Sequence, residues 1–75
     1  MKSYKDFDRD SGIAAYDYGP DWIHVQFKTG SVYEYTYSSA GQRNIYEMKR
    51  LADLGDGLNS FINKNVLKLY SRRVR

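Results

Sequence analysis

The chain has 75 residues, contains no cysteine and carries a formal net charge of +3. One hydrophobic core is only marginally sufficient at this length, so we expect a single domain. Without cysteine, the chain can form neither a disulfide nor a cysteine zinc site, which favours a reducing compartment. Tyrosine accounts for 8 aromatic residues, against 3 phenylalanines and 1 tryptophan, and must therefore supply much of the buried apolar area.

No apolar run in the sequence approaches the roughly 20 residues that a membrane-spanning helix needs. The first residues are not followed by the apolar segment of a signal peptide. We therefore expect a soluble, cytoplasmic protein with no membrane partner.

Residues 1–10 are polar and acidic, and we interpret them as a flexible acidic arm. The alternating acids Asp6, Asp8 and Asp10 approximate the ligand spacing of a calcium loop. The required glycine falls one position late, however, Asp17 stands where a bidentate glutamate is needed, and no helical pattern flanks the segment. We therefore prefer a solvated arm and predict no metal site.

The middle of the chain predicts three antiparallel strands. Residues 13–18 form the first candidate strand, and residues 19–21, Gly-Pro-Asp, favour a turn. Two alternating apolar runs within residues 22–35 then predict a β-hairpin.

The hairpin turn decides which side chains share a face of the sheet. A two-residue loop would place β-branched Thr29 at positive φ, whereas a three-residue loop over residues 28–30 requires positive φ only of Gly30. The three-residue loop places Val25 opposite Tyr33 and puts the tyrosines of this strand on the buried face. The opposite, more exposed face then carries Trp22, His24, Gln26, Val32, Glu34 and Thr36.

Helical spacing follows the strands. Ser39 and Gln42 form a candidate capping box, which predicts a helix over about residues 40–54. A second helix is expected over about residues 58–65, and its continuation toward Tyr70 is left open. The fold class is α+β, with a three-stranded antiparallel β-meander packed against one or two α-helices. The expected core comprises Ile23, Val25, Phe27, Tyr33, Tyr35, Ile45, Met48, Phe61 and Ile62.

The surface of the first helix carries charges at helical spacing. Lys49 and Asp53 are expected to form an i,i+4 ion pair, and Arg43, Glu47 and Arg50 to join similar pairs. Each such pair contributes only a few tenths of a kcal/mol, so we interpret these charges as a solvated surface.

Several short motifs follow one another in a set order, namely Ser11-Gly12-Ile13, Tyr16-Asp17, Val25-x-Phe27-x-x-Gly30-x-x-Tyr33-x-Tyr35, Gly57 and Phe61-Ile62-Asn63. This order resembles the KTSC domain, a small bacterial family that occurs alone and at the C-terminus of some lysyl-tRNA synthetases. The likeness spans residues 11–70, and this fusion to a tRNA-handling enzyme suggests RNA binding without enzymatic activity. The chain departs from the family where Ser38-Ser39 replaces a proline-containing helix entry, and where no serine closely precedes Gly57.

Catalytic groups are scarce. With one histidine, His24, and no cysteine, the chain offers no Cys-His pair, no multi-histidine metal site and no Ser-His pair with residues to spare. We expect His24 to be a surface residue, and we predict a non-enzymatic binding module without a cofactor.

The last twelve residues contain five Lys or Arg residues and no acid, ending in a basic tail over residues 71–75. Such a cluster can neutralise phosphates, and exposed aromatic rings can stack on unpaired bases. We therefore predict RNA or single-stranded nucleic acid as the partner. The alternative is a protein-interaction module or weak homodimer that uses an exposed sheet edge, and otherwise a monomer. The predicted nucleic-acid contacts are Lys64, Lys68, Arg72, Arg73, Arg75 and Trp22.

Overall fold

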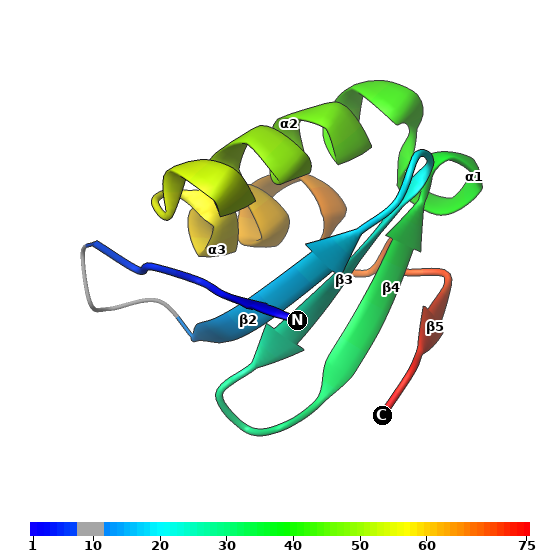
Figure 1. Cartoon of the computed structure of the whole chain (residues 1–75). Coiled ribbons are helices and arrows are strands. Elements are labelled where there is room, and N and C mark those ends of the chain that lie inside the picture. Colours follow the sequence, from blue (N-terminus) through cyan, green and yellow to red (C-terminus); the bar gives the residue numbers. More distant parts are fainter. Residues whose placement is uncertain (8–11) are drawn as a thin grey trace.

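An antiparallel sheet is covered on one face by helices in the computed structural model of this chain (Figure 1). The structure describes residues 1–7 and 12–75, so that Asp8 and Asp10 of the calcium-loop pattern lie outside the described residues. Within that part of the chain, the strands are β1 (Lys2–Ser3), β2 (Ile13–Tyr18), β3 (Trp22–Phe27), β4 (Val32–Thr36) and β5 (Arg72–Arg73). The helices are α1 (Tyr37–Ala40), α2 (Gln42–Leu54), α3 (Leu58–Phe61) and the π-helix η1 (Ile62–Val66).

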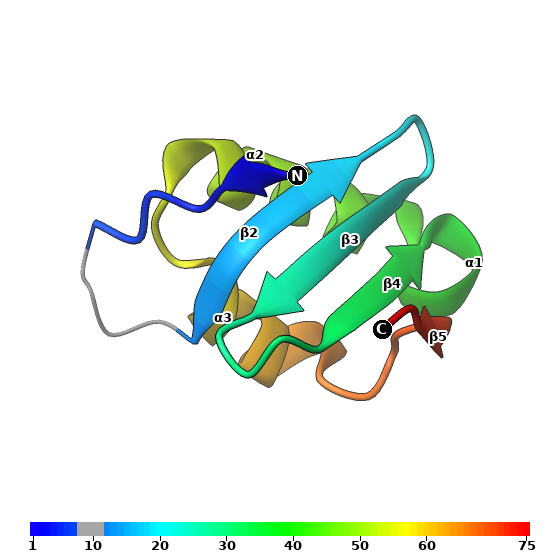
Figure 2. The same ribbon diagram turned by 60° about the horizontal axis from the view of Figure 1, so that its bottom comes forward.

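The strands follow chain order across the sheet, from β1 to β5, and each neighbouring pair is antiparallel. The predicted α+β class is confirmed, and the predicted three-stranded meander forms the centre of the larger sheet. The face away from the helices, here called the open face, is seen from the front in Figure 2.

The predicted three-residue hairpin loop is confirmed. The N–H of Phe27 donates to the carbonyl of Ser31 at 2.9 Å, and the N–H of Gly30 donates to the carbonyl of Phe27 at 2.8 Å. Gly30 has a φ of 98°, a conformation that glycine adopts without the steric cost that a Cβ brings. As a result, Val25 lies opposite Tyr33 as predicted.

Residues 1–10 were expected to form a flexible acidic arm, but part of this segment is ordered within the fold. Lys2 and Ser3 pair with β2, and the side chain of Tyr4 is only 6% exposed. The hydroxyl of Tyr4 accepts a hydrogen bond from the N–H of Leu58 at 3.2 Å. Burial of this ring and the backbone pairing to β2 together outweigh the local polarity that suggested a loose arm.

The C-terminal residues likewise differ from a flexible tail, because Arg72 and Arg73 form β5 along the edge of β4. This leaves each meander edge covered by a two-residue strand, β1 on one side and β5 on the other, as Figure 2 shows.

The predicted start of the first helix is wrong. The capping box joins Thr36 and Ser39, whose side chains each accept a hydrogen bond from the other residue's backbone N–H, and it opens the single turn α1. Gly41, with a φ of 93°, separates α1 from α2. Its positive φ ends the first turn, so the long helix starts at Gln42, and its predicted end at Leu54 is confirmed. The second predicted helix corresponds to α3 and η1 together.

Most of the predicted core is confirmed, since Ile23, Val25, Tyr35, Ile45, Met48 and Ile62 are buried. The side chains of Phe27, Tyr33 and Phe61 are only partly buried and pack against this core. Phe27 and Tyr33 border a cavity at the edge of the core, and Phe61 borders a groove. The helices therefore do not fully cover any of these three side chains. The core also contains Tyr4, Ile13, Tyr16, Ala40, Ala52, Leu58 and Val66.

Candidate nucleic-acid interface

Three of the predicted basic residues lie along the edge of the sheet. Strand β5 pairs with Tyr33 and Glu34 of β4, and the N–H of Val32 donates to the last carbonyl of the chain at 3.1 Å. The three residues are Arg72, Arg73 and Arg75, and we call them the basic edge. Their side chains are exposed, while pairing with β4 fixes their backbone.

Glu34 anchors β5 from the open face. Its carboxylate accepts hydrogen bonds from Nε2 of His24 at 2.9 Å, from the hydroxyl of Ser71 at 2.7 Å and from Nε of Arg72 at 3.3 Å. The bonds from His24, Ser71 and Arg72, in that order, lower the pKa of Glu34 to about 2. A carboxylate held ionised in this way ties the middle of the sheet to its basic edge.

The same cluster joins a serine, a histidine and a glutamate, but in an order unlike a nucleophilic triad. The hydroxyl of Ser71 donates to Glu34 and not to His24. A triad requires the imidazole between the hydroxyl and the carboxylate, so that the imidazole can take the hydroxyl proton. The arrangement therefore positions β5 and does not prepare Ser71 for attack.

Trp22 provides the large aromatic surface of the open face. Its ring lies beside that of His24, with centroids 4.4 Å apart and planes tilted by 44°. The indole also packs against Gly19, where a Cβ would come within 2.3 Å of the indole Nε1. Glycine in the β2–β3 turn therefore allows the half-buried indole to lie in this position.

On the helical side of the same edge lies a cavity of about 180 Å³, which we call the tyrosine cavity. The ring of Tyr33 lies 4.7 Å from that of Tyr70 and 5.9 Å from that of Phe27, between centroids. Burial, with smaller effects of Tyr33 and Tyr70, raises the pKa of Tyr35 to about 12. The cavity is lined by Phe27, Tyr33, Tyr35, Ile62, Asn63, Leu67 and Tyr70.

The remaining predicted cations do not belong to the basic edge. Lys64 lies in η1 and Lys68 follows it, both exposed. In the chain they directly follow Asn63 and Leu67, which line the tyrosine cavity. The structure thus divides the predicted cations between the sheet edge and the helical layer.

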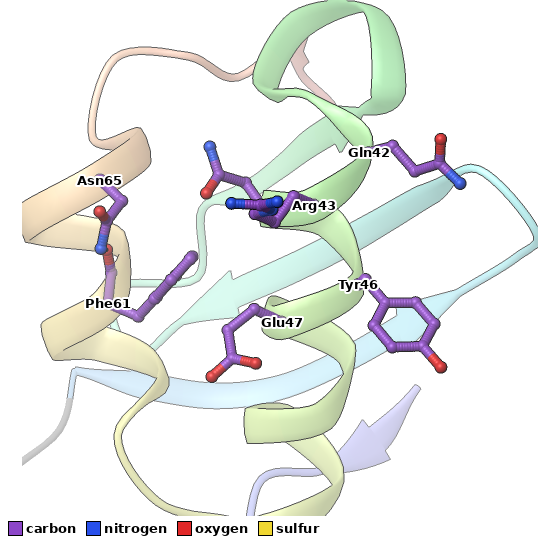
Figure 3. A pocket seen from close by; sticks show the side chains of 7 residues that line it. Gln42, Arg43, Tyr46, Glu47, Phe61 and Asn65 are labelled. Carbon is purple, nitrogen blue, oxygen red and sulfur yellow. The ribbon is translucent and has the colours of Figure 1, made fainter.

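A second concavity, an open groove of about 850 Å³, lies between α2 and the α3–η1 segment. In Figure 3, Arg43, Glu47, Phe61 and Asn65 project toward this space, whereas Tyr46 projects away from it. Glu47 is paired with Arg50, whose guanidinium lowers the pKa of that carboxyl. The groove therefore presents charges of both signs, which gives weaker attraction for a polyanion than the basic edge.

Asp53 joins the sheet to α2. It accepts hydrogen bonds from the hydroxyls of Tyr16 and Tyr18, each at 2.7 Å. The predicted Lys49–Asp53 ion pair is wrong, because Nζ of Lys49 donates to the backbone carbonyls of the β2–β3 turn at 2.6 and 2.9 Å. The two tyrosine hydroxyls hold Asp53 against the sheet, and the two carbonyls hold Lys49 at the β2–β3 turn.

Sequence reasoning missed two residues of this region, Ser71 and Tyr70. Both act through contacts with β4, which precedes them by more than thirty residues in the chain. No local spacing carries that information.

No family model, curated protein or solved structure matches this chain. Among residues 1–7 and 12–75, no helix has both the length and the apolarity to cross a membrane.

Proposed function

We propose that this protein is a KTSC-like, non-enzymatic module that binds single-stranded RNA along the basic edge. The observation that carries the proposal is the pairing of β5 with β4, which fixes the backbone of Arg72 and Arg73 along the sheet edge and places Arg72 on the aromatic open face. A flexible tail would lose backbone conformational entropy on binding. Arginines on a paired strand have already lost that entropy on folding, so their binding costs less.

Charge supports a polyanionic partner. Within the described residues, neither Arg73 nor Arg75 pairs with an acidic side chain, and Arg73 donates only to Ser31 and to the carbonyl of Arg75. Their guanidinium groups therefore keep donors that can reach phosphate oxygens. Arg72 also contacts Glu34, so its first role is to hold β5 in place.

Aromatic side chains support an unpaired strand over a duplex. Trp22 and His24 lie on the open face, and both residue types stack on bases that are not already paired. In the strand register, Trp22 and Arg72 are separated by two strand spacings across the sheet and by two residues along it. Together these offsets correspond to a distance on the order of 12 Å. A short single strand can span that distance.

The predicted alternative, a protein-interaction module or weak homodimer, has less support. It relied on the exposed edge of a three-stranded sheet, and β1 and β5 cover the meander on both sides. The outer edges are now only two residues long, which is one of the ways in which proteins prevent edge pairing. We also propose a cytoplasmic location, which fits a chain without cysteine.

Direct titration tests the function. Labelled single-stranded RNA, the same sequence as a duplex, and single-stranded DNA are each titrated at about 50 mM and about 200 mM salt. We expect tighter binding of the single strands, weakened at the higher salt, with a change in the fluorescence of Trp22, the single tryptophan. Absence of binding at the lower salt contradicts the proposal, as does equal affinity for the duplex with no change in Trp22 fluorescence.

A further inference from the structure

We propose that the tyrosine cavity binds one unpaired pyrimidine base. This inference rests on the proposed RNA-binding function, and it assigns to the cavity the recognition of a single nucleotide within the bound strand. The same ring could also come from a free nucleoside, and the experiment below separates the two sources.

The hydroxyl of Tyr35 is the first reason to treat the cavity as a binding site. The side chain of Tyr35 is only 2% exposed, and no hydrogen bond of its hydroxyl is found among the described residues. Yet no fully buried polar side-chain atom in the described part of the chain lacks a partner. The hydroxyl of Tyr35 therefore reaches accessible space, and the cavity that Tyr35 lines supplies that space. A ligand with a polar edge that enters the cavity can therefore form a hydrogen bond with this hydroxyl.

The volume of the cavity is sufficient for one six-membered ring. Its volume is about 180 Å³, and an apolar cavity of about 150 Å³ in another protein is large enough to hold benzene. One six-membered ring therefore fits. We infer a pyrimidine as the occupant over the larger purine, and the adenosine arm of the experiment below tests that choice.

The walls of the cavity are suited to a flat, polar ring. The rings of Tyr35 and Tyr70 stand edge to face, with centroids 6.4 Å apart and planes at 88°. A planar guest can therefore stack on one ring while it meets the edge of another. The side-chain amide of Asn63 adds both donors and an acceptor at the wall, and a pyrimidine presents both kinds of group on its pairing edge.

The position of the cavity connects it with the basic edge. Tyr33, one wall of the cavity, lies directly opposite Arg73 in the β4–β5 pairing. A strand whose phosphates contact Arg73 therefore passes close to Tyr33. This adjacency favours a base within a strand over an unrelated small aromatic compound.

The experiment uses NMR of the full chain with three probes, namely uridine, adenosine and an oligouridine strand. It compares Leu67→Trp, which places a large ring at the cavity wall, with Leu69→Trp, a matched control. Both leucines are exposed, by 53% and 43%, so neither change disturbs the core, and only Leu67 lines the cavity. Tyr35→Phe, which keeps the ring and removes the hydroxyl, is the third variant.

The inference predicts that uridine shifts the resonances of Tyr33, Tyr35 and Tyr70 and binds at least fivefold more tightly than adenosine. Oligouridine is expected to cause the same shifts, which Leu67→Trp abolishes and Leu69→Trp retains. Tyr35→Phe is expected to weaken uridine binding severalfold. The lost hydroxyl removes one hydrogen bond, which contributes about 0.5–1.5 kcal/mol and corresponds to a loss of about twofold to tenfold.

Each contrary result has a distinct meaning. If oligouridine binds and shifts the basic edge but not the cavity, and Leu67→Trp binds as the unaltered chain does, the cavity inference is overturned while RNA binding stands. If uridine shifts the cavity but no oligonucleotide binds, the ring site is supported with the free nucleoside as its source, and the RNA function is overturned. If neither probe shifts the cavity, the inference is overturned.

Discussion

The carboxylate of Glu34 accepts a hydrogen bond of 2.9 Å from Nε2 of His24 on the neighbouring strand, and the two side chains are only 17% and 20% exposed. From the other side, the same carboxylate accepts bonds from Ser71 and Arg72. One side chain of β4 thereby ties β3 to the C-terminal strand. The arginines proposed to bind RNA depend on this carboxylate for their position.

The pKa of Glu34 predicts an acid-dependent loss of stability. Because the folded pKa of about 2 lies below the ordinary value of 4.5, the folded state favours the ionised form. The stabilisation is complete above pH 4.5 and is lost as the pH falls through about 2. We expect Glu34→Gln to lower the free energy of unfolding by about 1–3 kcal/mol at neutral pH and to flatten its pH dependence over this window.

Glu47→Gln is the matched control for Glu34→Gln. Glu47 also has a lowered pKa and pairs with Arg50, but this pair lies on the exposed surface of α2. We expect Glu47→Gln to leave the free energy of unfolding nearly unchanged in chemical denaturation, because water and salt screen an exposed ion pair. Equal effects of the two substitutions would show that the Glu34 network does not hold β5.

Asp53 is predicted to control the ionisation of Tyr16. Burial, followed by the hydrogen bond to Asp53, raises the pKa of Tyr16 to about 12 from 10.0. Its stabilising contribution is therefore complete below pH 10.0 and is lost as the pH rises through about 12. Spectrophotometric titration of Asp53→Asn should show a tyrosine pKa that is lowered but still above 10.0, since burial remains. An unchanged titration curve would contradict the contact.

The glycine of the hairpin loop offers a test of the strand register. Gly30→Ala should destabilise the fold by about 1–2 kcal/mol in thermal or chemical unfolding, because its φ of 98° is unfavourable for a residue with a Cβ. Gly12→Ala is the control, since Gly12 has no positive φ and no atom within 4 Å of the added Cβ. We expect Gly12→Ala to change stability little, and a similar loss at both positions would argue against the loop geometry.

Local chemistry was sufficient to predict the centre of the sheet. The choice between loop lengths depended on the steric cost at Thr29, and the resulting pairing of Val25 with Tyr33 is the observed one. The prediction of where α2 starts was wrong because two local signals compete there. Thr36 caps a short turn with Ser39, and Gly41 interrupts the helix that Ser39 was expected to start.

The outer strands and the tyrosine cavity could not be predicted from local patterns. Two-residue strands such as β1 and β5 carry no alternation, and their positions are set by contacts with distant residues. The contact between Tyr33 and Tyr70 likewise joins β4 to the segment after η1. Composition identified the basic residues, whereas only the fold shows that three of them share an edge.

The salt dependence of RNA binding shows whether the arginines of the basic edge contact phosphates. The measurement compares Arg73→Gln/Arg75→Gln, which spares the contacts of Glu34, with Arg43→Gln/Arg50→Gln, an equal change of charge on α2. For single strands, each phosphate contact contributes about 0.7 to the slope of log affinity against log salt concentration. We predict that the β5 variant loses about 1.4 in slope and that the α2 variant keeps the original slope. Equal slopes for both variants would contradict binding at the basic edge.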